Sequence, residues 1–231
     1  MKIDIFGAVF LDRYIYEGNE GIHVQESLGG SGLNIALGLH LLGHNVKFYG
    51  NIGNDERQIK LLNRLNSYGF PTANISIKDG VTGLFIAKND KVDSVERGVN
   101  SGPLTINSNL LRGEYTVVTT ELNKDSLKQI VSYKWKQIFL DVGPRPNILT
   151  GISLPENIIK IGNLKENKII PCHVKKLGLR GASWGNAIVQ GNNELLPYTI
   201  GVGDLFDTLL IDGFIRGRGK EQVLKLAVEL A

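Results

Sequence analysis

Residues 201–204 read Gly-Val-Gly-Asp and stand directly before a predicted apolar helix. A Gly-x-Gly turn leaves backbone N–H groups uncovered, and such a group of amides can hold a phosphate or a developing oxyanion. The carboxylate of Asp204 beside these amides could act as a general base. The structural alternative is a capping box, because Asp204 and Asp207 have its spacing and both suit the positive end of a helix dipole. Capping does not require Gly201 or Gly203, so the pattern favours chemistry at this turn.

A second glycine-rich turn, Gly29-Gly30-Ser31-Gly32, opens a helix predicted for residues 31–42. Exposed amides at a helix N-terminus favour a polar or anionic ligand, but close packing of the helix on a strand explains the glycines at least as well. The dinucleotide-binding fingerprint fails, since Ile35 stands where it requires glycine or alanine, and no Gly-Lys-Ser/Thr follows any glycine loop. The sequence therefore argues against an NAD-dependent oxidoreductase. It argues equally against a nucleotide site of the Walker A type.

The elements that carry these turns alternate between strand and helix. Strands are predicted at residues 2–10, 45–53, 115–122 and 136–143, and helices at residues 31–42, 56–68 and 123–131. Two hairpins, at 14–25 and around Asn89-Asp90, do not fit the crossovers of such an alternation. We therefore expect a single α/β domain over residues 1–231, with a mostly parallel central sheet flanked by helices and a small β lid from about 12–28 and 82–98.

The later part of the chain is predicted to contain mainly short β-like pieces. A strand-like run ends at Ile200, and two helices follow at 204–216 and 220–230. Apolar spacing predicts that Ile59, Leu62 and Leu65 face inward on the helix at 56–68. The same argument places Leu205, Phe206, Leu209, Leu210 and Phe214 on the buried face of the helix at 204–216.

Composition narrows the classes of partner. The single cysteine, Cys172, excludes an intramolecular disulfide and a cysteine-based zinc cluster. The net charge of +3 comes from scattered lysines, so nucleic-acid binding is not indicated. No apolar run approaches the roughly 20 residues that span a bilayer, so we expect a cytoplasmic protein with no membrane partner.

At this point the motifs resemble a known family. GVGD followed by an apolar helix resembles the GAGD signature of the ribokinase-like carbohydrate kinases, the phosphofructokinase-B family. GGSGLNIALGLHLLGHNVKFYGNIGND, which begins at Gly29, is similar to the other signature of that family. Asp12 follows the first strand, DVGPRP at 141–146 resembles Asp-Pro-Asn-x-Arg, and residues 163–166 match Asn-x-x-Glu. The resemblance implies a ribokinase-like fold over nearly the whole chain.

The resemblance also implies a reaction, in which ATP with Mg²⁺ phosphorylates a hydroxyl of a sugar or nucleoside. Asp204 would be the general base, and the amides of Gly201, Val202 and Gly203 would form an anion hole. On the metal side, Asn163 and Glu166 would organise magnesium and the phosphates. In many members of the family the β lid also makes a dimer contact, which favours a homodimer here.

Substrate contacts follow from the same resemblance. Asp12, Gly29, Gly30 and Asn34 would bind the acceptor, since a carboxylate and a carboxamide can pair with vicinal hydroxyls. Asn100 and Arg145, together with Arg97, could contact an anionic or polyhydroxy ligand, although surface arginines are more often simply solvated.

The chain also departs from the family pattern. Ser31 is neutral where members commonly have lysine or another polar residue, which makes a phosphorylated sugar a less obvious substrate. Lys176 replaces the threonine of the Thr-x-Gly-x-x-Gly nucleotide loop that Gly178 and Gly181 otherwise match. A lysine there could reach a phosphate or could be solvated.

Length is the larger departure, and it leaves a second function open. The segment between Glu166 and Gly178 is shorter than in members of the family, and the sequence ends one helix after the helix that Asp204 opens. The nucleotide half of the site is therefore expected to be abbreviated. The alternative function is a non-catalytic sugar- or nucleoside-binding protein with a degraded nucleotide site.

Overall fold

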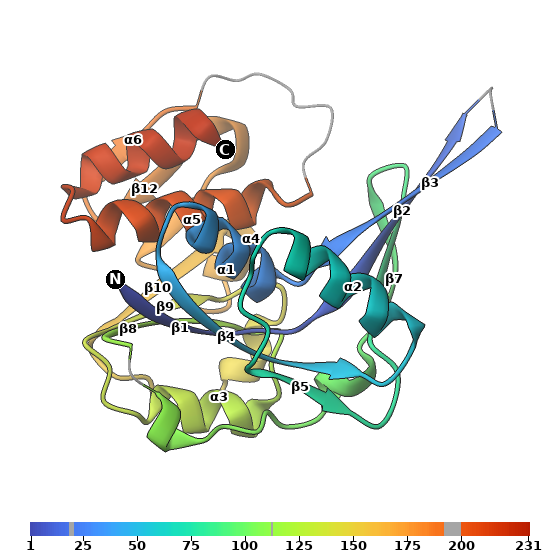
Figure 1. Cartoon of the computed structure of the whole chain (residues 1–231). Coiled ribbons are helices and arrows are strands. Elements are labelled where there is room, and N and C mark those ends of the chain that lie inside the picture. Colours follow the sequence, from blue (N-terminus) through green and yellow to red (C-terminus); the bar gives the residue numbers. More distant parts are fainter. Residues whose placement is uncertain (19–20, 112, 192–199) are drawn as a thin grey trace.

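The fold is built around a nine-stranded sheet (Figure 1), seen in a computed structural model that describes residues 1–18, 21–111, 113–191 and 200–231. Its strand order is β13-β12-β11-β10-β9-β8-β1-β4-β5. The pairs from β5 to β11 are parallel, and β12 and β13 are added antiparallel at one edge. The strands are β1 (Lys2–Phe6), β4 (Asn45–Gly53), β5 (Ile75–Lys78), β8 (Tyr115–Thr119), β9 (Gln137–Asp141), β10 (Ile158–Asn163), β11 (Val174–Lys176), β12 (Ala182–Trp184) and β13 (Ala187–Val189).

The order of the strands reverses between β1 and β8. From β1 the chain proceeds outward through β4 to β5, and from β8 it proceeds in the other direction through β9 and β10 to β11. In open parallel sheets, ligands bind at the carboxyl ends of the strands beside such a reversal. The topology therefore points to the segments that follow β1 and β8.

Helices cover both faces of this sheet. α1 (Ser31–Leu41), α2 (Glu56–Ser67), α5 (Val202–Ile215) and α6 (Lys220–Leu230) lie on one side, and α3 (Lys124–Val131) lies on the other (Figure 1). Two buried clusters correspond to the two faces, one containing Leu33, Leu65 and Leu210 and the other containing Leu127 and Ile130. One further short α-helix is α4 (Leu164–Asn167), and four 3₁₀ turns are η1 (Gly98–Ser101), η2 (Ser108–Leu110), η3 (Pro146–Leu149) and η4 (Gly178–Arg180). Among the described helices, none has the length and apolar character needed to cross a membrane.

A second, four-stranded sheet has the order β3-β2-β6-β7. Its strands are β2 (Phe10–Gly18), β3 (Gly21–Gly29), β6 (Gly83–Lys88) and β7 (Lys91–Glu96). The β6–β7 turn matches the predicted hairpin, because Asn89 and Asp90 both adopt the left-handed conformation that such turns need, with φ of 44° and 61°. The turn residues of the β2–β3 hairpin lie outside the described residues. In Figure 1 this hairpin projects away from the central sheet.

The structure confirms the α/β class with a mostly parallel sheet and corrects four details. The predicted first strand divides at Phe6, and β2 begins at Phe10. Between them, a Cβ on Gly7 would lie 2.6 Å from the Cα of Gly32, so the chain passes close to the start of α1 there. Ile59 is 61% exposed and Leu205 is 43% exposed, so neither faces the core. The predicted strand-like run ending at Ile200 lies mainly outside the described residues, and α5 starts two residues earlier than expected.

Candidate active site

The head of α5 lies against α1, and one side-chain contact joins them. Nδ2 of Asn34 donates a hydrogen bond of 2.8 Å to Oδ2 of Asp204. The two helices can approach because Gly38 lies opposite Thr208, where a Cβ would come within 2.7 Å of Cγ2. Asp204 therefore reaches across to another helix, and Gly201, the N-cap of α5, has no side-chain cap. The capping-box alternative is not what the structure has.

At the start of α5, after the turn before Asp204, the first amides have no acceptor among the described residues. Gly201 has φ of 88°, a left-handed conformation that favours glycine. The N–H groups of Asp204 and Leu205 both donate to the carbonyl of Gly201, at 3.1 and 3.0 Å. The N–H groups of Val202 and Gly203 stand at the first helical positions, which have no acceptor within a helix. These two amides and the helix dipole make this end of α5 suited to an anion.

Asp12 lies at the base of the second sheet and depends on Gly29. The two residues belong to neighbouring strands, and a Cβ on Gly29 would lie 1.8 Å from Oδ1 of Asp12. The hydroxyl of Tyr14 donates to Oδ2 of Asp12 at 3.2 Å. Burial raises the pKa of Asp12 to about 7, with the negative charge of Asp204 adding to the shift. Asp12 and Asp204 thus face the same region.

The glycines of the second turn are also explained by packing. Gly30 has φ of 100°, and a Cβ there would lie 2.2 Å from the carbonyl oxygen of Ala8. A Cβ on Gly32 would lie 2.6 Å from the Cα of Gly7. These contacts bring the start of α1 against the end of β1. Close packing of the helix on the strand therefore explains these glycines. The same packing places Asn34 beside Asp204.

Glu121 belongs to this site, although the sequence alone did not predict it. It follows β8, and its carboxylate accepts hydrogen bonds from the amides of Ser31 at 3.2 Å and Gly32 at 3.5 Å, at the N-terminus of α1. Burial raises the pKa of Glu121 to about 7, and the charge of Asp204 contributes. The signal that could have found it is the position of residue 121 directly after a strand at the reversal of strand order.

Lys176 is neither solvated nor pointed freely into a phosphate site. Its Nζ donates to both carboxylate oxygens of Asp207, at 3.1 and 3.0 Å, and lies 3.8 Å from Oδ1 of Asp141. Burial acts to lower the pKa of Lys176, but the charges of Asp207 and Asp141 outweigh it and hold that pKa above its usual value. A Cβ on Gly203 would lie 3.6 Å from this ammonium. A fixed positive charge therefore stands beneath the first amides of α5.

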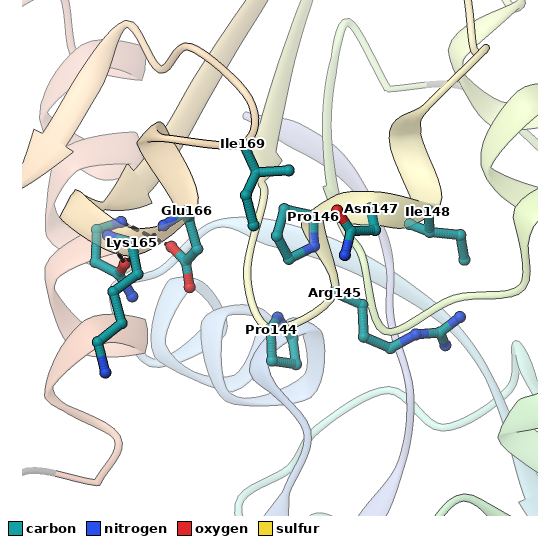
Figure 2. A pocket seen from close by; sticks show the side chains of 9 residues that line it. Pro144, Arg145, Pro146, Asn147, Ile148, Lys165, Glu166 and Ile169 are labelled. Atoms are coloured by element: carbon teal, nitrogen blue, oxygen red, sulfur yellow. Dashed lines mark hydrogen bonds between the residues drawn. The ribbon is translucent and has the colours of Figure 1, made fainter.

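Asn163 and Glu166 form a capping box at the start of α4. Oδ1 of Asn163 accepts from the amides of Lys165 and Glu166, and Oε2 of Glu166 accepts from the amide of Asn163 at 2.7 Å. Both residues line a cavity of about 720 Å³ between α4 and η3 (Figure 2). A Cβ on Gly143 would lie 2.3 Å from Oε1 of Glu166, so this glycine admits the carboxylate beside the end of β9.

The carboxylates near this cavity suit a metal that is shared with a ligand. Among the described residues, no group of three or more acidic, histidine or cysteine side chains is arranged to hold an ion. Burial raises the pKa of Asp141 to about 6, the charge of Lys176 opposes this shift, and the charges of Asp204 and Glu166 add to it. Mg²⁺ is commonly held by one or two carboxylates together with substrate phosphates. Asp141 and Glu166 therefore suit a Mg²⁺ ion that is also bound by substrate phosphates, rather than an ion held by protein ligands alone.

The remaining predicted residues lie near these groups with their own contacts. Oδ1 of Asn100 accepts from the amide of Val9 at 3.2 Å, and Nδ2 donates to its carbonyl at 2.7 Å, so both ends of this buried amide group bind the backbone of Val9. Gly178 and Gly181 have φ of 63° and 94° and form the tight η4 turn after Lys176. A Cβ on Gly181 would lie 2.0 Å from the carbonyl of Val189, which accounts for that glycine structurally.

Comparison of the sequence with known proteins agrees with this architecture. Residues 1–111 match the model of the pfkB family of carbohydrate kinases. A guanosine-inosine kinase from Exiguobacterium acetylicum is 28% identical over 102 residues, which make up 44% of this chain and 33% of that protein. The matched segment thus spans about a third of the length of this curated relative.

Solved structures match across almost the whole chain. Ribokinase from Cryptococcus neoformans var. grubii, in complex with ADP, superposes with a TM-score of 0.79 at 18% identity, covering 98% of this chain and 91% of that one. Arabidopsis thaliana ribokinase, complexed with ribose and ATP, gives 0.77 at 20% identity, with coverages of 98% and 90%. Burkholderia thailandensis nucleoside kinase, in complex with inosine, gives 0.72 at 16%, with 99% and 89%. The chain therefore has the ribokinase fold, and the resemblance of its sequence to the pfkB family is confirmed.

Proposed function

We propose that this chain is a kinase that transfers the γ-phosphate of ATP to a hydroxyl of a sugar or nucleoside. The observation that carries the proposal is the position of the Asp204 carboxylate. It accepts a hydrogen bond from Asn34 of α1 and lies next to the first amides of α5. The related proteins named above are kinases or ribokinase-fold proteins bound to ADP, ATP, ribose or inosine, and this supports the same class of reaction.

In the proposed reaction, the acceptor hydroxyl attacks the γ-phosphorus and Asp204 takes its proton. A bond forms between the acceptor oxygen and phosphorus, the bond from phosphorus to the β–γ bridging oxygen breaks, and ADP leaves. The amides of Val202 and Gly203, with Gly201 setting their direction, would stabilise charge on the transferred group. A carboxylate at hydrogen-bonding range is sufficient here, because such transfers depend mainly on positioning and charge stabilisation.

The acceptor would bind between α1 and the second sheet. Asp12 and Asn34 would pair with its hydroxyls, and Gly29 and Gly30 would let its ring approach the backbone. Glu121 is added to this set, because its carboxylate lies at the same helix terminus and is influenced by the charge of Asp204.

The nucleotide phosphates would lie between α5 and the cavity beside α4. Mg²⁺, bound jointly with the phosphates and held by Glu166 with Asp141, would neutralise charge on them, and Asn163 would orient Glu166. Lys176 would add a point charge beneath the amides, positioned by Asp207. The sheet of β2, β3, β6 and β7 would act as the lid that excludes water from the reacting groups.

Two measurements test the kinase proposal. Thermal-shift assays with Mg-ATP, ADP, sugars and nucleosides should show stabilisation by a nucleotide and by an acceptor, since a ligand at 100 times its Kd stabilises by about 2.7 kcal/mol. ADP release should then depend on an acceptor from the same panel. Nucleotide binding without any acceptor-dependent ADP release would contradict the proposal.

The second candidate is a sugar- or nucleoside-binding protein without catalysis. It is favoured by one observation: Lys176, Asn163 and Glu166 already make strong contacts within the chain, which would weaken a nucleotide site. Stabilisation by sugars or nucleosides with no response to ATP or ADP would decide for this function.

A further inference from the structure

One face of α2 carries a row of three basic side chains. Arg57, Lys60 and Arg64 are three and four residues apart, a spacing that places them on the same side of a helix. All three contact the second sheet, and Figure 1 shows α2 beside the base of that sheet. The proposed reaction uses none of the three.

Glu26 of β3 is the centre of these contacts. Its Oε1 accepts from Nε and Nη2 of Arg13 in β2, at 3.1 and 2.7 Å. Its Oε2 accepts from Nζ of Lys60 at 3.0 Å, and its backbone carbonyl accepts from Nη1 of Arg64 at 2.7 Å. The hydrogen bonds from Arg13 and Lys60 hold the pKa of Glu26 below its usual value, so the carboxylate is charged at neutral pH. One residue of β3 thus joins the neighbouring strand to α2.

Arg57 holds the opposite side of the same sheet. Its Nη1 donates to the carbonyl of Thr82, directly before β6, at 2.6 Å and to Oε2 of Glu96, at the end of β7, at 3.0 Å. Asp55, the N-cap of α2, accepts from the amide and the hydroxyl of Thr82 at 2.9 and 2.6 Å. Because β3 and β7 are the two edge strands of this sheet, α2 contacts both of its edges.

These contacts lie on the face of the sheet that is opposite to Asp12. Asp12 and Arg13 are successive residues of β2, so their side chains point to opposite faces. Glu26 pairs with Arg13 and shares its face. Glu96 lies on that face too, because its partner in β6 pairs in turn with the residue two positions before Arg13. The sheet is therefore held from behind by α2, while Asp12 faces the proposed acceptor.

The ion pairs of this network are individually weak. Lys60 is 58% exposed and Glu96 is 50% exposed, and an exposed pair changes an equilibrium by no more than about 5-fold and weakens as salt is added. Several weak contacts suit an element that must move when an acceptor enters and a product leaves. The angle of the sheet, and with it the position of Asp12, should therefore respond to ionic strength.

We propose that Glu26 is a positioning residue for the acceptor: together with the basic row of α2, it holds the second sheet at the angle that places Asp12 against the acceptor. The inference rests on the proposed binding of the acceptor by Asp12. Glu26 acts through the sheet and does not touch the substrate. Affinity for an acceptor should consequently depend on ionic strength even when the acceptor has no charge.

The test is calorimetric titration with ribose and with inosine, two neutral acceptors, between about 0.01 and 1 M NaCl. Over this range the screening length falls from about 30 Å to about 3 Å. The wild-type Kd should rise about 2- to 5-fold with salt. Glu26→Gln should raise Kd by a similar factor at low salt and remove most of the salt dependence. In ADP-release assays KM for the acceptor should rise more than kcat falls, because Asp204 and the amides of α5 are untouched.

Two further variants assign the effect to the contact with α2. Lys60→Met should also raise Kd at low salt, and Glu26→Gln combined with Lys60→Met should bind no more weakly than Glu26→Gln alone, since either change breaks the pair. Glu114→Gln is the matched control. It removes an exposed pair with Lys136 of the same length, 3.0 Å, directly before β8 and away from the carboxyl ends of the strands. Its Kd and salt dependence should equal those of the wild type.

A wild-type Kd that does not change with salt, or a Glu26→Gln variant that binds as tightly as the wild type at low salt, would overturn this inference and leave the kinase function standing. Tighter binding by Glu26→Gln would overturn it as well, because the network would then hold the sheet away from the acceptor. Effects that multiply in the double variant would exclude the pair with Lys60 as the cause. If neither acceptor binds and no sugar or nucleoside supports ADP release, the proposed function fails and the inference with it.

Discussion

Gly29 acts through the space that it leaves for the carboxylate of Asp12. It has no unusual φ, so the requirement is steric: the two residues lie on the paired strands β2 and β3, and a Cβ on Gly29 would overlap the carboxylate oxygen of Asp12. Both residues were predicted from the sequence as substrate contacts, and their mutual contact adds a second reason for the glycine. A side chain at position 29 would displace the group that is proposed to bind the acceptor.

Gly29→Ala should therefore reduce acceptor binding more than stability. Overlap of this kind forces a shift of the surrounding groups and typically costs about 1–3 kcal/mol. Calorimetric titration with the acceptor and thermal unfolding would separate the two effects. Gly219→Ala is the matched control, because nothing lies within 4 Å of a Cβ there. Unchanged acceptor affinity in Gly29→Ala would contradict the role given to Asp12.

Asp12 and Glu121 also predict a dependence of stability on pH. Both have folded-state pKa values of about 7, above the values of 3.8 and 4.5 for the free groups, chiefly because of burial. Between these limits the folded chain holds protons that the unfolded chain has released, so the free energy of unfolding falls as pH rises. A tenfold change in an acid dissociation constant on folding corresponds to about 1.4 kcal/mol per group.

The measurement is Tm between pH 5 and 8 in the absence of ligands. Tm should decrease toward pH 7, and Asp12→Asn, which keeps the shape of the side chain, should show a shallower decrease. An equal slope in the wild-type and variant proteins would show that Asp12 does not titrate in this range.

At the scale of elements, local signals explain what the sequence could predict. Gly43 and Gly69 adopt φ of 86° and 65° after α1 and α2, as expected for residues that end helices, and Asn123 caps α3 as predicted. The incorrect predictions concern which face of a helix is buried and which residues contact one another. Ile59 lies on a helix whose buried side is defined by Leu61 and Leu65, and apolar spacing alone did not distinguish the two faces.

The ion pair of Lys176 and Asp207 shows why part of the site could not be predicted from the sequence. Lys176 ends β11 and Asp207 lies in α5, so their contact depends on how these elements pack. The spacing of Asp207 from Asp204 suggested a cap, whereas its side chain is 1% exposed and bound to the lysine. Asn34 and Asp204 meet as the family resemblance implied, but their direct hydrogen bond, like the position of Glu121, follows from the tertiary structure.

Breaking this ion pair on one side should be costly. Lys176→Met should lower the free energy of unfolding by about 3–5 kcal/mol, because it leaves the buried Asp207 carboxylate without its partner. Asp207→Leu should cost less, because Lys176 keeps Asp141 at 3.8 Å. The double variant should regain part of the stability, since Lys176 and Asp207 are removed together and only Asp141 loses a partner. It should lack activity if the ammonium serves the phosphates. Chemical denaturation and ADP release measure the two effects. Full activity in a stable double variant would contradict the proposed role of Lys176.

The whole molecule combines a covered central sheet with a second sheet that leaves apolar side chains exposed. Ile22 and Val24 of β3 are 70% and 51% exposed, and Val92 and Val95 of β7 are 63% and 51% exposed. β3 and β7 are the two edge strands of this sheet, and exposed apolar side chains can mark an interaction site. The homodimer through the lid, which the family resemblance favoured, stays a prediction, and these side chains are its candidate contacts.

Replacing Val24 and Val95 by lysine should therefore yield monomers, because charges at an apolar contact lose their hydration on association. Sedimentation of the wild-type protein and the variant over a range of concentrations provides the measurement. Ile77→Lys, at an exposed position of β5 outside this sheet, is the control. A wild-type protein that remains monomeric at high concentration would contradict the dimer.

The most direct test of the proposed chemistry is the transfer of labelled γ-phosphate from ATP to the acceptor by the wild-type protein and by Asp204→Asn. The variant can keep the contact with Asn34 through an amide oxygen but has no base. We predict that transfer falls at least about 10²-fold while ATP and acceptor binding persist. Equal transfer by the two proteins would show that Asp204 does not act as the base.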